Sequence, residues 1–237
     1  MTSSFRTRLL DAATAPYRPA GRFAWHFARG KLGRDPVFTG ILAHGLLPAQ
    51  ARILDLGCGQ GLLSNWITAA GRLHATGDWP STWPAPPTLA GYRGIELMQN
   101  DVDRARPALP AGAVVEQGDI RHSDFGRPNA VVILDSLHYV TLPEQEAVLA
   151  RARDALAPEG MLVMRVGDAA AGLPFKLSNW VDRLVTFIRG HRLGTLYCRP
   201  VADWQRSLEQ LGFQVQVLPM SHGTPFANTM LIGRLGG

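Results

Sequence analysis

Three glycines at alternate positions after an apolar run indicate a nucleotide-type binding site. The stretch ARILDLGCGQGLL contains Gly57, Gly59 and Gly61, and Asp55 stands two residues before the first of them. Glycine lets the backbone turn sharply, and it lets a ligand approach main-chain N–H groups where a Cβ atom would collide. Because the turn follows a strand-like run and precedes a helical one, we favour a cofactor site over a purely structural turn.

Two further acids stand at the ends of later apolar runs and are of the right type to bind an adenosine. Glu96 ends YRGIE, where a carboxylate can accept hydrogen bonds from both ribose hydroxyls. Asp119 ends AVVEQGD, where it can accept from the adenine amino group while Ile120 packs on the ring. Leu97 or Met98 would then cover the opposite face of the ring.

The spacing of the ribose acid is unusual. Glu96 lies about twice as far from Asp55 as the ~20 positions that are usual in a dinucleotide fold. Asp78 competes at near-normal spacing, but it follows no run long enough to be a strand. We therefore prefer Glu96, and we attribute the extra length to the Pro- and Trp-rich stretch 71–91.

The elements that must position these residues alternate between strands and helices. Apolar runs of strand type occur at 52–56, 92–97, 113–116, 130–134, 161–166, 213–218 and 229–232. The clearest helix spans 144–157, with Pro143 at its start and Pro158 and Gly160 after its end. This alternation predicts an α/β protein whose mostly parallel sheet has helices on both faces and an antiparallel C-terminal hairpin at one edge.

Three stretches fall outside this alternation. Residues 1–50 are predicted to form a helical cap or lid, with a helix that begins at Asp35 as N-cap and Pro36. Residues 71–91 are predicted to be irregular, because prolines remove hydrogen-bond donors. Residues 167–200 are predicted to cover the substrate. The main domain would then span 51–237.

Composition limits the classes of protein that the chain can belong to. Of 237 residues, 46% are hydrophobic and 18% charged, which fits one soluble globular domain and excludes a disordered chain or a membrane-spanning helix. The net charge of +5 suggests nucleic acid, but scattered arginine carries almost all of the positive charge, so we expect no nucleic-acid partner. Two cysteines without metal-ligand spacing, and no secretion signal, predict a metal-free cytoplasmic protein.

The motifs in this order resemble the class I S-adenosylmethionine-dependent methyltransferases. DLGCGQG matches the family's first motif, GIEL its second, GDI its third, and VVILDSLHYV its fourth strand with the following loop. LARARDALAPEGMLVMRV resembles the fifth element, and LEQLGFQVQVL with NTMLIGRL resembles the terminal hairpin. The resemblance implies a Rossmann-like, seven-stranded sheet. A nicotinamide cofactor is the weaker alternative, because its GxGxxG fingerprint needs the third glycine one residue later.

The resemblance also implies which residues hold the cofactor. Asp55 would bind the ammonium group of S-adenosylmethionine, the glycines its methionine and ribose, Glu96 the ribose diol, and Asp119 the adenine. The full implied set is Asp55, Gly57, Cys58, Gly59, Gly61, Glu96, Leu97, Met98, Asp119, Ile120 and Asp135.

The loop after the fourth strand faces the methyl group in this fold, so it holds the catalytic candidates. They are His138 and Tyr139, with Asp135 and Ser136 beside them. His138 can act as a general base on a hydroxyl group, and the alternative is that LHY only packs at a helix entry. The loop lacks the Asn/Asp-Pro-Pro-aromatic tetrapeptide of nucleic-acid amino methylation and the nucleophilic cysteine of cytosine carbon-5 methylation.

Aromatic and basic residues interleave in the N-terminal cap and suggest a lid over the substrate. The candidates are Tyr17, Arg18, Phe23, Trp25, His26, Phe27, Arg29 and Lys31, with Trp180, His191 and Arg192 in the second cap. Arg29 or Lys31 could pair with the cofactor carboxylate. The alternative is a surface helix whose aromatic side chains pack on the core and whose charges are solvated.

These observations favour a small-molecule methyltransferase, with O-methylation of an aromatic or polyketide-like acceptor in secondary metabolism. YRPAGRFAWHFARGKLGRDPVF and WPSTWPAPP resemble methyltransferases of bacterial aryl-polyene or related pigment biosynthesis. The alternatives are an RNA or protein acceptor, and a non-catalytic partner that binds S-adenosylmethionine. The accepting molecule and the oligomeric state stay open.

Overall fold

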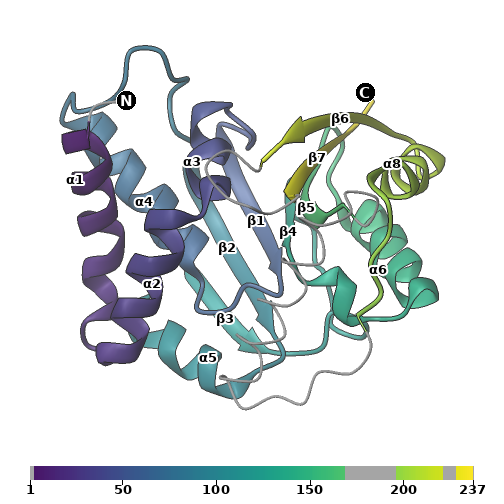
Figure 1. The fold of residues 1–237 in the computed structure, drawn as a ribbon, viewed down its shortest axis with the longest axis horizontal. Coiled ribbons are helices and arrows are strands. Elements are labelled where there is room, and N and C mark those ends of the chain that lie inside the picture. The colour runs from purple at the N-terminus through teal and green to yellow at the C-terminus, as the bar shows by residue number, and fades with distance from the viewer. Residues whose placement is uncertain (1–2, 169–195, 221–227, 237) are drawn as a thin grey trace.

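A seven-stranded sheet forms the centre of the protein, in the order β3-β2-β1-β4-β5-β7-β6 (Figure 1). The computed structural model describes residues 3–168, 196–220 and 228–236. The strands are β1 (Gln50–Leu56), β2 (Thr88–Glu96), β3 (Ala113–Gln117), β4 (Ala130–Leu134), β5 (Met161–Gly167), β6 (Phe213–Pro219) and β7 (Asn228–Leu235). All seven predicted strands are present.

The directions of the strands confirm the predicted mostly parallel sheet with an antiparallel C-terminal hairpin at one edge. Neighbours from β3 to β5 are parallel, and β7 is antiparallel to both β5 and β6. The strand order reverses between β1 and β4, which lie side by side although β2 and β3 come between them in the chain. Ligands of open α/β sheets bind at such a switch point, outside the carboxyl ends of the strands.

Helices cover both faces of the sheet. They are α1 (Ser3–Thr14), α2 (Arg22–Arg34), α3 (Pro36–Ala43), α4 (Leu62–Ala75), α5 (Gln99–Ala105), α6 (Leu142–Ala155) and α8 (Val201–Gln210). Side chains of α1 to α5 share one apolar core with one face, and those of α6 and α8 share a second core with the other. Figure 1 shows the first group at the left of the sheet and α6 and α8 at the right. No helix within the described ranges is long and apolar enough to span a bilayer.

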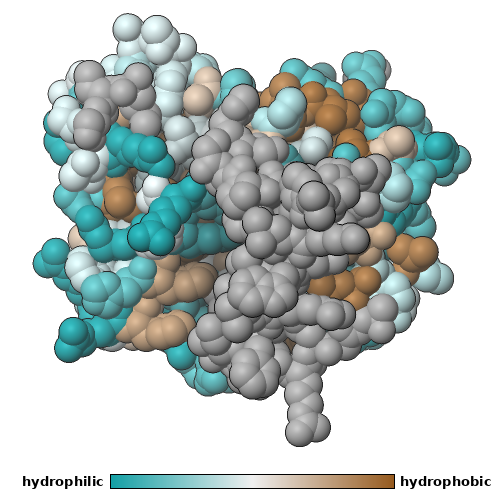
Figure 2. All heavy atoms as spheres, viewed as in Figure 1, coloured by the Kyte–Doolittle hydropathy of each residue, from teal (hydrophilic) through white to brown (hydrophobic). Residues whose placement is uncertain are grey.

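The N-terminal helices are packed into the same core as the sheet. Leu9 of α1 and Leu32 of α2 are fully buried together with Trp66 of α4. On the face shown in Figure 2, the helices at the left carry mostly hydrophilic or neutral residues, as expected when their apolar sides face inward. Asp35 is the N-cap of α3, as predicted, and its side chain accepts a hydrogen bond from the Val37 N–H at 3.1 Å.

The prediction that 71–91 is wholly irregular is wrong at both ends. Helix α4 continues to Ala75, and β2 begins at Thr88, which pairs with Gln50 of β1. The prolines that break regular structure begin only at position 80, so they do not interrupt either element. Between the two elements, Trp79 and Trp83 pack edge-to-face against Phe5 of α1, with ring centroids 5.6 and 5.8 Å apart.

Helix α6 begins and ends two residues earlier than predicted. Its start is set by a capping box, in which the Glu144 carboxylate accepts hydrogen bonds from both the N–H and the hydroxyl of Thr141 at 2.8 Å. The box lies directly after the β4 loop, so it fixes where that loop ends.

Candidate cofactor and acceptor site

The glycine turn after β1 has left-handed backbone at all three predicted positions. The φ angles are +78° at Gly57, +55° at Gly59 and +68° at Gly61, which residues with a Cβ atom rarely adopt. A Cβ atom on Gly57 would overlap the Ser136 side chain, whereas one on Gly59 would meet no atom within 4 Å. Gly57 therefore lets the turn approach the β4 loop, and Gly59 faces open space.

Glu96 connects this turn to the end of β2. Its carboxylate accepts hydrogen bonds from the N–H of Gly59 at 2.8 Å and of Met98 at 3.0 Å. A carboxylate is an acceptor-only group, which suits the donor hydroxyls of a ribose. Leu97 beside it is 59% exposed, although it is large and apolar. An apolar side chain next to a carboxylate suits a nucleoside.

Asp55 lies beneath the turn and is almost fully buried. The Tyr92 hydroxyl of β2 donates a hydrogen bond to its carboxylate at 2.6 Å. Burial raises the pKa of Asp55 to about 7, against the opposing effect of the Tyr92 hydrogen bond. Burial also raises the pKa of the Cys58 thiol, whose sulfur fills the space where Gly94 would carry a Cβ atom. The structure thus gives Cys58 a packing contact.

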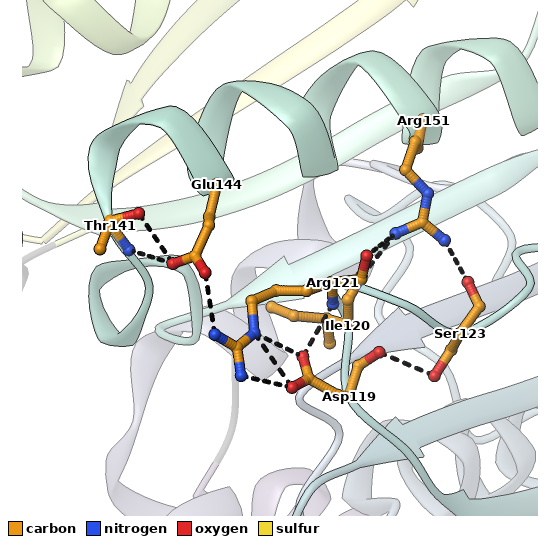
Figure 3. Close-up of polar contacts among 7 residues, drawn as sticks. All are labelled: Asp119, Ile120, Arg121, Ser123, Thr141, Glu144 and Arg151. Atoms are coloured by element: carbon orange, nitrogen blue, oxygen red, sulfur yellow. Dashed lines mark hydrogen bonds and ion pairs between the residues drawn. The ribbon is translucent and has the colours of Figure 1, made fainter.

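Asp119 is held by an arginine two residues further on (Figure 3). The Arg121 guanidinium donates from Nε to both carboxylate oxygens at 3.0 Å and from Nη2 at 2.6 Å, and it lowers the pKa of Asp119. Its Nη1 donates to Glu144 of the α6 capping box at 2.8 Å. Arg151 of α6 donates to the carbonyls of Ile120, Arg121 and Ser123 in the same loop. Helix α6 therefore fixes the loop that was predicted to bind adenine.

An ion cluster joins the N-terminal helices to the ends of β4 and β5. Arg165 of β5, with a side chain only 2% exposed, donates hydrogen bonds to both Asp35 and Asp135. Lys31 Nζ lies 2.8 Å from Asp35 and 3.7 Å from Asp135. Asp135 has a left-handed φ of +57°. Burial alone would raise the pKa values of both carboxyls, but the charges of Arg165 and Lys31 outweigh it and lower both.

A small cavity lies beside this cluster, at the carboxyl ends of β4 and β5. Its described lining includes Asp135, His138, Arg165, Cys198, Arg199 and Trp204. His138 Nε2 is buried and has no hydrogen-bond partner among the described residues. Burial lowers the pKa of His138, and the Asp135 charge opposes the shift. The ring of Tyr139 packs against His138 at 4.2 Å between centroids and is partly exposed.

Two of the predicted lid residues make structural contacts. Tyr17 is fully buried, donates to the Gln60 carbonyl at 2.9 Å and accepts from Asn65 at 3.1 Å, which ties the N-terminal region to the glycine turn. Arg29 pairs with Asp11 at 2.5 Å. These contacts orient both side chains within the protein, so we do not include them in the proposed substrate site.

The other lid candidates differ in their surroundings. Phe23 is 51% exposed, stacks on Phe27 at 6.3 Å and lies under the Arg104 guanidinium. The Trp25 ring contacts both His26 and the Arg18 guanidinium. Trp180, His191 and Arg192, like most of the predicted second cap, lie outside the described residues.

Sequence reasoning did not identify Arg165, Arg121 or Tyr92 as site residues. The sequence does mark Arg165 as unusual, because it is the one charged residue in the apolar strand MLVMRVG. Its partner Asp35 is 130 positions away, and no local pattern connects the two.

Comparison with known proteins finds a family that matches most of the chain. A family described as "methyltransferase domain" matches residues 24–218. A carboxy-S-adenosyl-L-methionine synthase of Chromohalobacter salexigens is 32% identical over 131 residues, which are 53% of this chain and 43% of that protein. The chain thus matches less than half the length of this relative.

Solved structures share the fold at low sequence identity. An O-methyltransferase family protein from Burkholderia thailandensis has a TM-score of 0.62 at 18% identity, over 91% of this chain and 59% of that one. Magnesium protoporphyrin IX methyltransferase from Synechocystis PCC 6803, with bound SAH, has a TM-score of 0.59 at 18% identity, over 97% and 98% of the two chains. The family match covers most of the sequence, and the chain therefore belongs to the methyltransferase-domain family and has the fold of the class I S-adenosylmethionine-dependent methyltransferases.

Proposed function

We propose that this methyltransferase transfers the methyl group of S-adenosylmethionine to an oxygen atom of a small molecule, an aromatic or polyketide-like compound of secondary metabolism. The observation that carries the proposal is the arrangement around two neighbouring loops. Open space above Gly59 lies beside Glu96 on one side. On the other side, the β4 loop holds His138, which lines a cavity and whose buried Nε2 has no hydrogen-bond partner among the described residues.

The cofactor side of the site fits S-adenosylmethionine. The glycine turn would line the methionine and ribose portion, and Glu96 would accept from the ribose hydroxyls. Exposed Leu97 would cover one face of the adenine ring. Asp119, held by Arg121, would present an oxygen lone pair to the adenine amino group. Asp55 would hold the ammonium group from below the turn, directly or through water.

The acceptor side fits removal of a proton from a hydroxyl group. When bound, S-adenosylmethionine supplies an electrophilic methyl group on a sulfonium. The chain aligns the acceptor, excludes water and takes up the released proton. A lowered pKa keeps His138 neutral at neutral pH, so its Nε2 can accept that proton. Tyr139 and Phe23, both partly exposed, would contact the apolar part of the acceptor.

Other acceptors are less well supported by the charges on the surface. Several arginines are paired with carboxylates, among them Arg8, Arg93, Arg121 and Arg199. Paired arginines do not form the continuous basic surface that an RNA acceptor would need. We propose a small-molecule acceptor for this reason. We also propose that the protein acts in the cytoplasm.

The test is to trace a labelled methyl group. The protein is incubated with methyl-labelled S-adenosylmethionine and a metabolite, RNA or protein fraction of the source organism, and the label is followed by mass spectrometry. Label in a small molecule, as an oxygen-bound methyl group, supports the proposal. Label in RNA or protein, or a modified S-adenosylmethionine as the relative's name suggests, would overturn it. A Glu96→Ala variant serves as the cofactor-binding control.

A further inference from the structure

The ion cluster contains equal numbers of positive and negative groups. Arg165 and Lys31 provide two cations, and Asp35 and Asp135 provide two carboxylates. Arg165 is inaccessible to solvent, with donors to both carboxylates, whereas the Lys31 side chain is 39% exposed. Lys31 is thus the most exposed of the four side chains in the cluster.

The cluster borders the cavity that contains His138. Asp135 and Arg165 belong both to the cluster and to the cavity lining. Lys31 and Asp35 contact those two residues directly, so the cluster reaches the imidazole through Asp135, whose charge acts on His138. Unit charges act on one another over about 10 Å at 0.1 M salt, and less screening applies to buried groups.

We propose that the N-terminal helices control the protonation of the acceptor site: Lys31 and Asp35, through Arg165 and Asp135, keep the charge around His138 balanced. When the charges around it are balanced, burial keeps the imidazole neutral, so that it can receive a proton. Loss of Lys31 would leave one excess negative charge, which favours the imidazolium. Loss of the Asp35 charge would leave one excess positive charge, which disfavours it. Lys31 is then a positioning residue for the reaction, although it comes from outside the sheet.

Three other titratable groups lie near His138 among the described residues, and each has its own contacts or state. Arg199 lines the same cavity, but it pairs with Glu146 at 2.5 Å and lies over the Trp204 ring. Cys198 lines the cavity as a thiol without a disulfide. The Tyr139 ring packs on the imidazole. Each of these groups is unchanged in the variants below, so differences between variants report on the cluster.

The inference narrows the substrate class of the proposed function, on which it rests. A neutral imidazole is needed where the acceptor is an O–H group. As the oxygen lone pair forms the new C–O bond, the C–S bond breaks with its electrons going to sulfur, and the O–H proton moves to His138 Nε2. A carboxylate acceptor has no proton to release. The acceptor is therefore a hydroxyl compound, a phenol or an alcohol.

The experiment measures the pKa of His138 directly by NMR in the full chain, without acceptor or cofactor. Imidazole 15N signals are followed against pH, and a His138→Gln variant assigns the signal. Lys31→Met should raise the pKa of His138. Asp35→Asn, which keeps an N-cap acceptor for Val37, should lower it. Arg29→Met is the matched control, since Arg29 is on the same helix with a side chain 31% exposed and pairs with Asp11 instead.

The outcomes separate an electrostatic role from a structural one. A rise in Lys31→Met with no change in Arg29→Met supports the proposal, and an opposite shift in Asp35→Asn strengthens it. An unchanged pKa in Lys31→Met, or an equal shift in Arg29→Met, overturns it. Asp35→Asn affects a buried pair, so if that variant does not fold, Lys31→Met alone decides. Because no methyl transfer is measured, failure here is distinct from failure of the proposed function.

Discussion

The Glu96 carboxylate joins the glycine turn to β2, and its removal should weaken cofactor binding. Glu96→Ala removes the acceptor for the Gly59 N–H and for the ribose hydroxyls. A lost buried hydrogen-bond partner costs about 1–3 kcal/mol, so the Kd for S-adenosylmethionine should rise roughly 5- to 150-fold by calorimetry. Glu116→Ala is a matched control at the end of β3, where the carboxylate pairs with Arg93. Equal affinities in Glu96→Ala and the wild type would contradict the ribose assignment.

His138 should matter for turnover and not for cofactor affinity. If Nε2 takes the acceptor proton, His138→Ala should lower the rate of methyl transfer about 10²- to 10⁴-fold. Its Kd for S-adenosylmethionine should stay near the wild-type value, because no described contact joins His138 to the glycine turn. Full-rate transfer by the variant would reject the role of base and leave the loop as a packing element.

Asp55 should make the protein less stable as the pH rises through the mildly acidic range. Its pKa is near 3.8 in an unfolded chain and about 7 in the folded protein. Between these values the folded state retains a proton that the unfolded state has lost. Asp55 should therefore lower the free energy of unfolding by about 1.4 kcal/mol per pH unit from about pH 4 to about pH 7.

The Asp55→Asn variant isolates this effect. Its amide oxygen still accepts the Tyr92 hydrogen bond, but it does not titrate. Urea unfolding at a series of pH values should show a flatter dependence in the variant than in the wild type over that interval. Parallel curves would mean that burial does not raise the pKa of Asp55.

Site residues could be predicted from the sequence where a residue of suitable chemistry stands at the end of a strand. The glycine turn follows β1 directly and Glu96 is the last residue of β2, so their place at the carboxyl edge was predictable from sequence. Arg165 was not, because an arginine in a buried strand is interpretable only when its two carboxylate partners are known. Asp119 lies in the loop that follows β3, and its Arg121 clamp could not be distinguished in the sequence from a solvated side chain.

At the scale of elements, the α2–α3 junction is bound to β5 by a buried ion pair. Asp35→Ala removes the N-cap of α3 and one partner of Arg165. Breaking a buried pair in this way should lower the free energy of unfolding by about 3 kcal/mol or more. Asp11→Ala breaks an exposed pair with Arg29 and should cost less than about 1 kcal/mol. Chemical denaturation of both variants tests the difference, and equal losses would contradict it.

Element boundaries were predictable to within a turn where end signals are local. β4 was predicted with its observed bounds because it is a continuous apolar run. The start of α6 was placed late because Pro143 was read as the first signal, whereas the capping box of Thr141 and Glu144 sets it. The end of α4 was predicted too early, because the irregular stretch was expected to start at Gly71. No strong helix breaker occurs between Gly71 and position 77, and the helix continues to Ala75.

For the whole molecule, the N-terminal helices and the sheet form one apolar core. Leu9 of α1 is in the same cluster as Leu63 of α4. Leu9→Ala should therefore lower the free energy of unfolding by about 2–5 kcal/mol, in a single transition. Leu142→Ala, at an exposed leucine, should change it little. Loss of α1, α2 and α3 together in a separate transition would show instead that residues 1–50 unfold as their own domain.

The predicted division at residue 50 is a hypothesis that this experiment addresses. Sequence alone indicated a separate cap because helices of residues 1–50 precede the first strand. Burial of Tyr17 against the glycine turn could not be read from a local pattern, because its partners Gln60 and Asn65 are more than 40 positions away.

The place of β7 has a consequence for the order in which the sheet can be assembled during synthesis. β7 follows β6 in the chain but lies between β5 and β6. Until the ribosome has released β7, β5 presents an open edge and β6 has no strand partner within the described sheet. An unpaired apolar edge favours association between chains. The nascent protein is therefore most prone to aggregate during the final stage of translation of this region.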